Sequence, residues 1–238
     1  MKKIILILMV IGIFHHQSIS QELSLDKILD KFYKENAIDK LQKVKTIVMT
    51  GTITRNDLMP YKTTKMRPDK IRIDFELADL EAVQAYNGQI GWSTAPWTGN
   101  PKPVQMNEDA AGGMKIRADF DGILYKWKEK GHQASLIGKD TINGIEVFKI
   151  QILKKAGGKE YYFIGCKDFL LHKQLGTRMV RGQEVDMESF FRDYRKIEGI
   201  WFAYTNETKM GGQPYSVVEY EKIELNPPVD EKIFEMPK

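Results

Sequence analysis

The sequence predicts a mainly β (α+β) fold, with a strongly curved antiparallel sheet of about eleven strands that forms a half-barrel under a few short helices. Three observations lead to this fold class. Apolar and polar residues alternate with a period of two over most of the chain. Gly- and Asn-containing turn signals separate the alternating segments. Two amphipathic helical segments and a loop rich in Pro and Gly are inserted among them, as separate covers for a bent sheet.

Alternation identifies each expected strand. In the first, Ile47, Met49 and Ile53 alternate with Thr and Val residues, a β-branched composition typical of strands. A tight Asn87-Gly88 turn ends the fourth, and the meander continues after it. The expected strands are 47–54, 61–66, 70–75, 82–86, 90–93, 132–139, 146–154, 160–164, 170–178, 185–197, 201–209 and 215–225.

Helical spacing occurs in two places. Residues 25–32 carry apolar side chains on one stripe and charged side chains on the other, after a possible N-cap at Ser24. A second helix is predicted over 119–130, where an apolar stripe recurs. Residues 94–118 are expected to form a loop, in which 108–118 has only weak helical character because of two adjacent glycines.

The N-terminus predicts export. Lys2 and Lys3 precede a run of eleven apolar residues, 4–14, and small residues follow at Ser18 and Ser20. This is the layout of a secretory signal peptide. As a helix the run spans about 16 Å, against about 30 Å of membrane hydrocarbon, so it is too short to cross a bilayer. We therefore expect a signal peptide over 1–20 and a single periplasmic domain over 21–238.

The cysteine count adds two expectations. Lipidation requires a Cys at the cleavage site, near Ser20/Gln21, and the only Cys in the chain is Cys166. The exported protein is therefore expected to be neither a lipoprotein nor membrane-spanning. A single Cys also excludes an internal disulfide, so the apolar core must provide the stability.

Charge and motif content favour a binding protein over an enzyme. Removing Lys2 and Lys3 lowers the basic residues from 36 to 34, against 32 acidic residues, so the net charge falls from +4 to +2. Such a mixed surface does not predict nucleic-acid binding. The His residues and Cys166 do not form a metal-binding or catalytic motif, and no phosphate loop occurs, so no metal or cofactor is expected. Asp119 and Asp121 are interpreted as helix caps rather than as an acid–base pair.

Four short motifs, in this order and spacing, resemble the LolA family of periplasmic lipoprotein carriers and outer membrane lipoprotein-sorting proteins. The resemblance extends to the LolB receptor and the RseB sensor, which share the half-barrel fold. It covers most of the chain after the signal peptide. The motifs are Met66-Arg67-Pro68 with Ile71-Arg72-Ile73, Tyr86-Asn87-Gly88 with Gly91-Trp92, Asp119-Phe120-Asp121-Gly122, and Asn226-Pro227-Pro228-Val229-Asp230 with Phe234 and Pro237.

The resemblance implies a carrier for a hydrophobic ligand, namely lipoprotein acyl chains or lipid moved toward the outer membrane. Inner- and outer-membrane lipoprotein-transport proteins would then be its partners. In these carriers the Arg before the Pro bonds to the covering helices and keeps the empty cavity shut, a gate role that falls to Arg67. The alternative for Arg67 is an edge-strand arginine paired with a carboxylate.

The predicted ligand site is an apolar space between the sheet and its covers. A fully packed core without a cavity is the structural alternative, and an envelope-stress sensor or protein-binding module on the same fold is the functional one. The residues predicted to line the cavity are Ile47, Met49, Ile53, Ile71, Ile73, Phe75, Trp92, Phe148, Ile150, Ile152, Phe190 and Tyr204.

Overall fold

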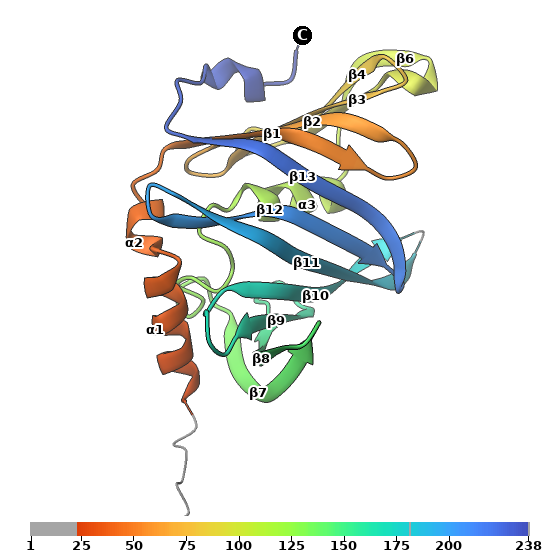
Figure 1. Cartoon of the computed structure of the whole chain (residues 1–238). Helices are drawn as coiled ribbons and strands as arrows, with labels where there is room; N and C mark the ends of the chain where they lie inside the picture. Colours follow the sequence, from red (N-terminus) through yellow and green to blue (C-terminus); the bar gives the residue numbers. More distant parts are fainter. Residues whose placement is uncertain (1–22, 181, 238) are drawn as a thin grey trace, which may run out of the picture.

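In the computed structural model of the chain, 13 antiparallel strands form one continuous, strongly curved sheet (Figure 1). The structure describes residues 23–180 and 182–237, so the predicted signal peptide over 1–20 lies outside the described residues. The strands are β1 (Thr46–Thr54), β2 (Leu58–Met66), β3 (Lys70–Leu77), β4 (Leu80–Tyr86), β5 (Gly91–Ala95), β6 (Asn100–Gln105), β7 (Gln133–Ile142), β8 (Ile145–Leu153), β9 (Lys159–Gly165), β10 (Leu171–Val180), β11 (Gln183–Ile197), β12 (Ile200–Met210) and β13 (Gln213–Leu225).

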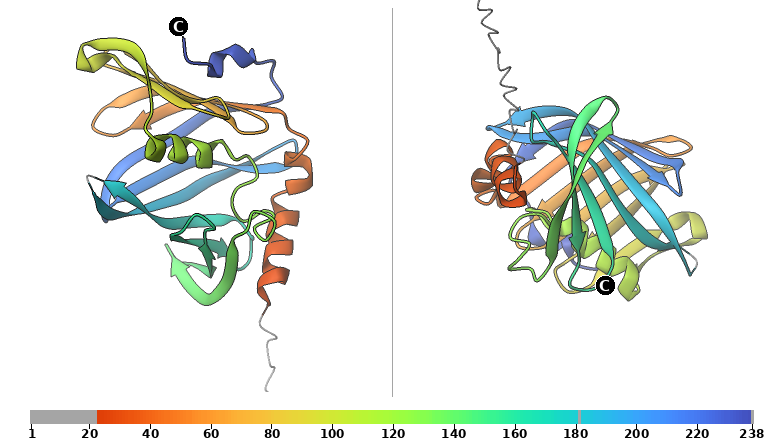
Figure 2. Two further views of the ribbon diagram at one scale, coloured as in Figure 1. Left: turned by 180° about the vertical axis from the view of Figure 1, so that it is seen from behind. Right: turned by 90° about the horizontal axis from the view of Figure 1, so that it is seen from below.

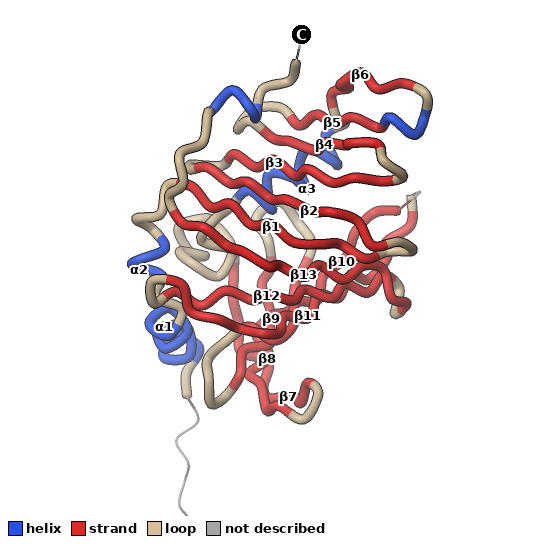
Figure 3. The backbone as a smooth tube through the Cα atoms, turned by 45° about the horizontal axis from the view of Figure 1, so that its top comes forward, coloured by secondary structure: helices blue, strands red, loops and turns tan. Residues whose placement is uncertain are grey.

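The order of the strands explains why the sheet needs a cover. They lie side by side in the order β6-β5-β4-β3-β2-β1-β13-β12-β11-β10-β9-β8-β7, and the first strand pairs with the last in the middle (Figure 3). Strands β6 and β7 are consecutive in the chain but form opposite edges of the sheet. The segment that joins them, residues 106–132, therefore has to cross from one edge to the other.

That segment crosses on the concave side of the sheet. It contains α3 (Glu108–Ala118), which packs on β3, β4 and β5 and lies in front of the strands in the rear view (Figure 2). Gly91 of β5 allows this close approach, since a Cβ there would lie 3.1 Å from the Ala111 Cα of α3. The other helices are α1 (Leu25–Glu35) and α2 (Ile38–Leu41), which lie along one side of the curved sheet (Figure 1).

Two local predictions are corrected by the structure. Residues 108–118 form a regular helix, because Asn107 caps it by accepting a hydrogen bond from the Ala110 N–H at 2.9 Å. The predicted helix over 119–130 is instead a series of turns. Gly122 and Lys126 have positive φ angles of 69° and 53°, which an α-helix cannot accommodate.

The loop predicted over 94–118 also contains a strand that the sequence did not reveal. Strand β6 pairs with β5 and forms an edge of the sheet. Its Pro101 and Pro103 lack N–H donors, and proline on an edge strand hinders further strand pairing. Within residues 23–180 and 182–237, no helix combines the length and the apolar character needed to cross a membrane.

Side chains on the concave face form three apolar clusters with the helices. Ile28 and Leu29 of α1 pack on β8 and β9, and Met114 and Ala118 of α3 pack on β1 to β4. Between them, Phe120 packs with residues of β1, β12 and β13. The helices thus bury the apolar side of the sheet at both ends, which accounts for most of the core.

A separate cover lies on the convex face. The 3-10 helix η2 (Glu231–Phe234) buries Phe234 completely, and the Phe234 carbonyl accepts a hydrogen bond from Trp92 Nε1 at 2.8 Å. Arg72 of β3 donates to the Ile233 carbonyl at 2.9 Å. The C-terminal segment therefore fastens the outside of the sheet, opposite α3.

Candidate functional site

Most of the predicted cavity residues share the concave face, but two do not. Register fixes the face, because residues paired across neighbouring strands point to the same side. Trp92 pairs with Ala85, which pairs with Arg72, so all three point to the convex side, where Trp92 contacts η2. Phe190 lies between Lys173 and Lys209, also on the convex side. The prediction that Trp92 and Phe190 line the concave face was therefore wrong.

The other ten residues point toward the helices. They fall into the three apolar clusters rather than around one enclosed space. Three of them pack under α1, namely Phe148, Ile150 and Ile152. The other seven are divided between the cluster under α3 and the cluster around Phe120. The members near α3 are Ile53, Ile71, Ile73 and Phe75, and those near Phe120 are Ile47, Met49 and Tyr204.

Between the two covered ends, concave-face side chains stay partly exposed. Met49, Phe191, Phe202 and Tyr220 are all intermediate in exposure, although each is large and mostly apolar. Two open hollows of about 380 and 640 Å³ are also present, and neither has a residue of α1, α2 or α3 in its lining. The apolar concave surface is thus covered by the helices at its ends, and a ligand chain would have to displace them to reach that part of the surface.

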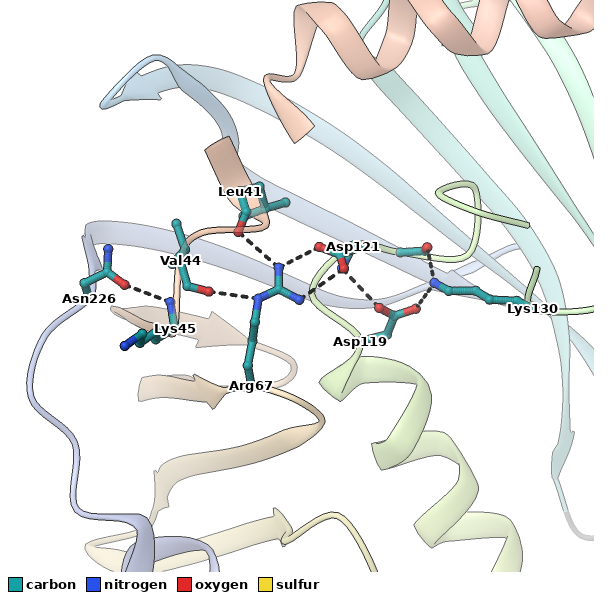
Figure 4. A network of polar contacts seen from close by, with 9 residues as sticks. Leu41, Val44, Lys45, Arg67, Asp119, Asp121, Lys130 and Asn226 are labelled. Carbon is teal, nitrogen blue, oxygen red and sulfur yellow. Dashed lines mark hydrogen bonds and ion pairs between the residues drawn. The ribbon is translucent and has the colours of Figure 1, made fainter. Parts of the chain in front are cut away.

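Arg67 fastens two covering segments to the sheet (Figure 4). It follows the last residue of β2 and donates from Nε to the Val44 carbonyl at 2.9 Å and from Nη2 to the Leu41 carbonyl at 3.0 Å. On its other side it binds both carboxylate oxygens of Asp121, at 2.6 and 3.1 Å. We call Arg67 and these three partners the Arg67 latch. One planar guanidinium thereby holds both the α2 segment and the segment that crosses from α3.

Further contacts hold the side chains around the Arg67 latch in place. The Arg67 guanidinium lies 4.6 Å from the centre of the Phe120 ring, within cation–π distance. Asp119 accepts the Asp121 N–H at 3.1 Å and an ammonium hydrogen of Lys130 at 2.6 Å. Asp119 and Asp121 are therefore not caps of a helix over 119–130; Asp121 is the ion-pair partner of Arg67. The Arg67–Asp121 pair is only partly exposed, at 25% and 18% of the two side chains.

The helix α1 is held by single hydrogen bonds near the other end of the sheet. The Tyr33 hydroxyl donates to the Leu124 carbonyl at 2.6 Å, and burial raises the pKa of Tyr33 to about 12. Asn36 donates to the Phe169 carbonyl at 3.0 Å, and Trp201 donates to Glu35 at 2.9 Å. Each contact joins the α1 segment to a different part of the chain, and ion pairs of Asp26 with Lys128 and of Glu35 with Lys196 add to them at 3.6 and 3.7 Å.

Two observations on the described residues concern metal binding and the reactivity of the cysteine. No group of three or more His, Cys, Asp or Glu side chains within 23–180 and 182–237 could hold a metal ion. Burial raises the pKa of the Cys166 thiol, whereas a nucleophilic cysteine needs a lowered pKa.

The sequence did not reveal the polar members of the concave face. Lys65 and Thr63 alternate in β2 with convex residues, and both point toward the helices, as their pairing with Ile71 and Ile73 shows. A polar residue at a position that alternation assigns to the apolar face is the signal that could have identified them.

Comparison with solved structures supports the fold. A LolA superfamily protein from Nitrosomonas europaea matches with a TM-score of 0.60 at 16% identity, over 90% of this chain and 98% of that chain. A DUF1329 family protein from Desulfovibrio piger matches with a TM-score of 0.61 at 14% identity, over 87% and 97%. A domain assigned to outer membrane lipoprotein sorting from Vibrio parahaemolyticus matches at 0.58 and 11% identity, over 85% and 97%.

The chain therefore has a LolA-like fold, and the predicted curved, mainly β architecture is confirmed. A scan against models of known protein families found no match, and a search of curated proteins found none. At these identities the likeness concerns the fold, so the function has to be argued from the residues of the site.

Proposed function

We propose that this protein is a periplasmic carrier that binds the acyl chains of a lipid or lipoprotein on its concave face. The observation that carries the proposal is the Arg67 latch, which holds two covering segments over an apolar surface through one side chain. The fold supports it, because two structural neighbours are described as a LolA superfamily protein and a lipoprotein-sorting domain. In this interpretation the Arg67 latch holds the closed state of the protein.

The energies are compatible with reversible binding. Burying ten methylene groups stabilises a complex by about 8 kcal/mol, at about 0.8 kcal/mol per group. The latch contributes four charge-assisted hydrogen bonds through one side chain, and losing that side chain is expected to cost about 2–4 kcal/mol. Because the gain from the acyl chain exceeds this cost, an acyl chain can displace the covers, and the covers can return when it leaves.

Ligand binding can be tested directly on the protein produced from the full chain. Native mass spectrometry of protein purified from membrane-containing extract should show bound lipid, and the apolar dye N-phenyl-1-naphthylamine should become fluorescent on binding. Lipid-free protein that takes up neither the dye nor a fatty acid would contradict the proposal. Recovery of a regulatory membrane protein in a pulldown, without any lipid, would instead favour the sensor alternative.

The gate role of Arg67 needs its own variant. Arg67→Leu should speed dye uptake several-fold, because the covers lose their shared attachment while the apolar surface is unchanged. Arg178→Leu is a matched control, since Arg178 is exposed on β10. Equal uptake rates in the wild type and both variants would show that Arg67 is structural and not a gate.

A further inference from the structure

A group of polar side chains interrupts the apolar concave face. Tyr61, Thr63 and Lys65 alternate along β2 and point to this face, about 7 Å apart at successive positions. Arg117 of α3 donates to the Tyr61 hydroxyl at 2.9 Å, and the Tyr220 ring of β13 lies 6.4 Å from that of Tyr61. We call these five residues the polar cluster.

Lys65 has no carboxylate partner among the described residues. Among residues 23–180 and 182–237 its ammonium forms no hydrogen bond or ion pair, and the nearest aromatic contact is the Phe120 ring at 5.9 Å. Asp119 is the carboxylate that acts on it electrostatically, but Asp119 is paired at 2.6 Å with Lys130. Lys65 is thus left on a largely apolar surface without a counter-ion.

Thr63 gives a second, independent indication of a ligand. Thr63 is only 3% exposed, and its Oγ1 has no hydrogen-bond partner within the part of the chain that the structure describes. The Tyr220 hydroxyl approaches Thr63 without the geometry of a hydrogen bond. A buried hydroxyl that makes no hydrogen bond costs stability, and such groups are rare in native proteins.

The charges around the cluster are unbalanced. Lys65, Arg67, Arg117 and Lys130 face two carboxylates, Asp119 and Asp121, which leaves an excess of two positive charges. Arg117 has a structural explanation, because a cation in the last turn of α3 interacts favourably with the helix dipole. No such explanation applies to Lys65, which lies in a strand.

We propose that the polar cluster binds the anionic headgroup of an amphiphile whose acyl chain lies on the adjacent apolar surface. A carboxylate or phosphate there would accept hydrogen bonds from Lys65, Thr63 and the tyrosine hydroxyls, and would neutralise the excess charge. The inference rests on the proposed function and narrows its ligand class to a fatty acid or an acidic lipid. Burial lowers the pKa of Lys65 to about 8, so it remains a cation at neutral pH.

The test compares ligands that differ only in charge. Displacement of N-phenyl-1-naphthylamine is measured with oleate against oleyl alcohol, and with dioleoyl phosphatidic acid against dioleoylglycerol. We expect at least one anion to bind about tenfold more tightly than its neutral counterpart. The stronger anion identifies the headgroup as carboxylate or phosphate, and inorganic phosphate alone should displace no dye.

Substitutions in β2 test whether the polar cluster causes the preference for anionic ligands. Lys65→Met should reduce the tenfold preference for the anion over its neutral counterpart to less than about threefold, and Lys65→Arg should retain most of it. Lys62→Met is the matched control, because Lys62 lies on the same strand, exposed, on the opposite face. Thermal melting confirms that each variant is folded. The comparison of anionic with neutral ligands on the wild-type protein does not depend on any variant.

Each result decides the inference. If the neutral and anionic partners bind equally, or if Lys65→Met keeps the preference, the headgroup site is wrong although acyl-chain binding stands. If no amphiphile displaces the dye, the carrier function and the headgroup site both fail. If inorganic phosphate binds in a Lys65-dependent way without an acyl chain, the site is one for free anions and the amphiphile assignment is overturned.

Discussion

Lys65 of β2 and Arg67, which directly follows that strand, lie two residues apart but differ in their hydrogen bonding. Both cations lie near the Phe120 ring, at 5.9 and 4.6 Å from its centre. Arg67 donates four hydrogen bonds, two to backbone carbonyls and two to Asp121. Lys65 makes no hydrogen bond among the described residues. The structure thus places a fully paired cation at the rim of the concave face and an unpaired one further in.

The difference separates what closes the protein from what we propose recognises its ligand. A paired charge stabilises the arrangement in which its partners meet, so Arg67 favours the covered state. An unpaired charge on a partly buried surface costs stability until an anion arrives. Natural proteins keep such costs mainly where they serve function.

The largest effect is expected from removing the latch. Arg67→Leu should lower the free energy of unfolding by about 2–4 kcal/mol, because Asp121 and two carbonyls lose their donor. Urea unfolding measures the change. Combining Arg67→Leu with Asp121→Leu should cost less than the sum of the single changes, since both act on one ion pair. Additive losses would show that the two side chains do not interact in solution.

Substitution of Lys65 is expected to change the free energy of unfolding in the opposite direction, toward greater stability. The pKa falls from 10.5 to about 8 in the folded protein, so the charge costs up to about 3 kcal/mol at pH 7, at 1.36 kcal/mol per pKa unit. Lys65→Met should therefore raise the free energy of unfolding by about 1–3 kcal/mol.

This gain should depend on pH in a defined direction. Below pH 8 the ammonium is charged in both states and the cost is complete, whereas above pH 10.5 it is neutral in both states and the cost is absent. The difference between wild type and Lys65→Met should therefore shrink as the pH rises from 8 to 10.5. Arg117, Asp119 and Lys130 are present in both proteins, so the difference isolates Lys65. A gain that stays constant over this range would refute burial as its cause.

A smaller effect is expected from the attachment of α1. Tyr33→Phe removes the hydrogen bond to the Leu124 carbonyl and should lower the free energy of unfolding by about 1 kcal/mol. Tyr125→Phe serves as the control, because Tyr125 contacts the Tyr33 ring edge to face but its hydroxyl makes no hydrogen bond to α1 within residues 23–180 and 182–237. Equal losses in the two variants would show that the hydroxyl of Tyr33 is dispensable.

The smallest effect tests the assignment of the two faces. Phe191 pairs with Asn206 on the concave side, whereas Phe190 pairs with Glu207 on the convex side. Phe191→Ser should weaken oleate binding about threefold through lost apolar contact, and Phe190→Ser should change it less than twofold. A larger effect from Phe190→Ser would contradict the concave face as the binding surface.

Local patterns predicted most of the strands correctly because a strand's period depends on neighbouring residues alone. Ile71 and Ile73 were correctly placed on one face of β3 for this reason. The same period does not say which face meets the helices, and a strand can satisfy alternation with either face inward. Trp92 and Phe190 were placed on the wrong face for this reason. On the convex side, η2 covers Trp92, and the ammonium groups of Lys173 and Lys209 lie over the Phe190 ring.

By itself the sequence determined the curved antiparallel architecture, the N-terminal helical cover and the position of an arginine before Pro68. Only the tertiary structure decided what Arg67 holds, because Asp121 lies 54 residues away and Leu41 26 residues away in the chain. Asp121 reaches Arg67 because the consecutive strands β6 and β7 lie at opposite edges of the sheet, so the segment that connects them crosses the concave face. Such a contact depends on the path of the whole chain, and no local spacing encodes it.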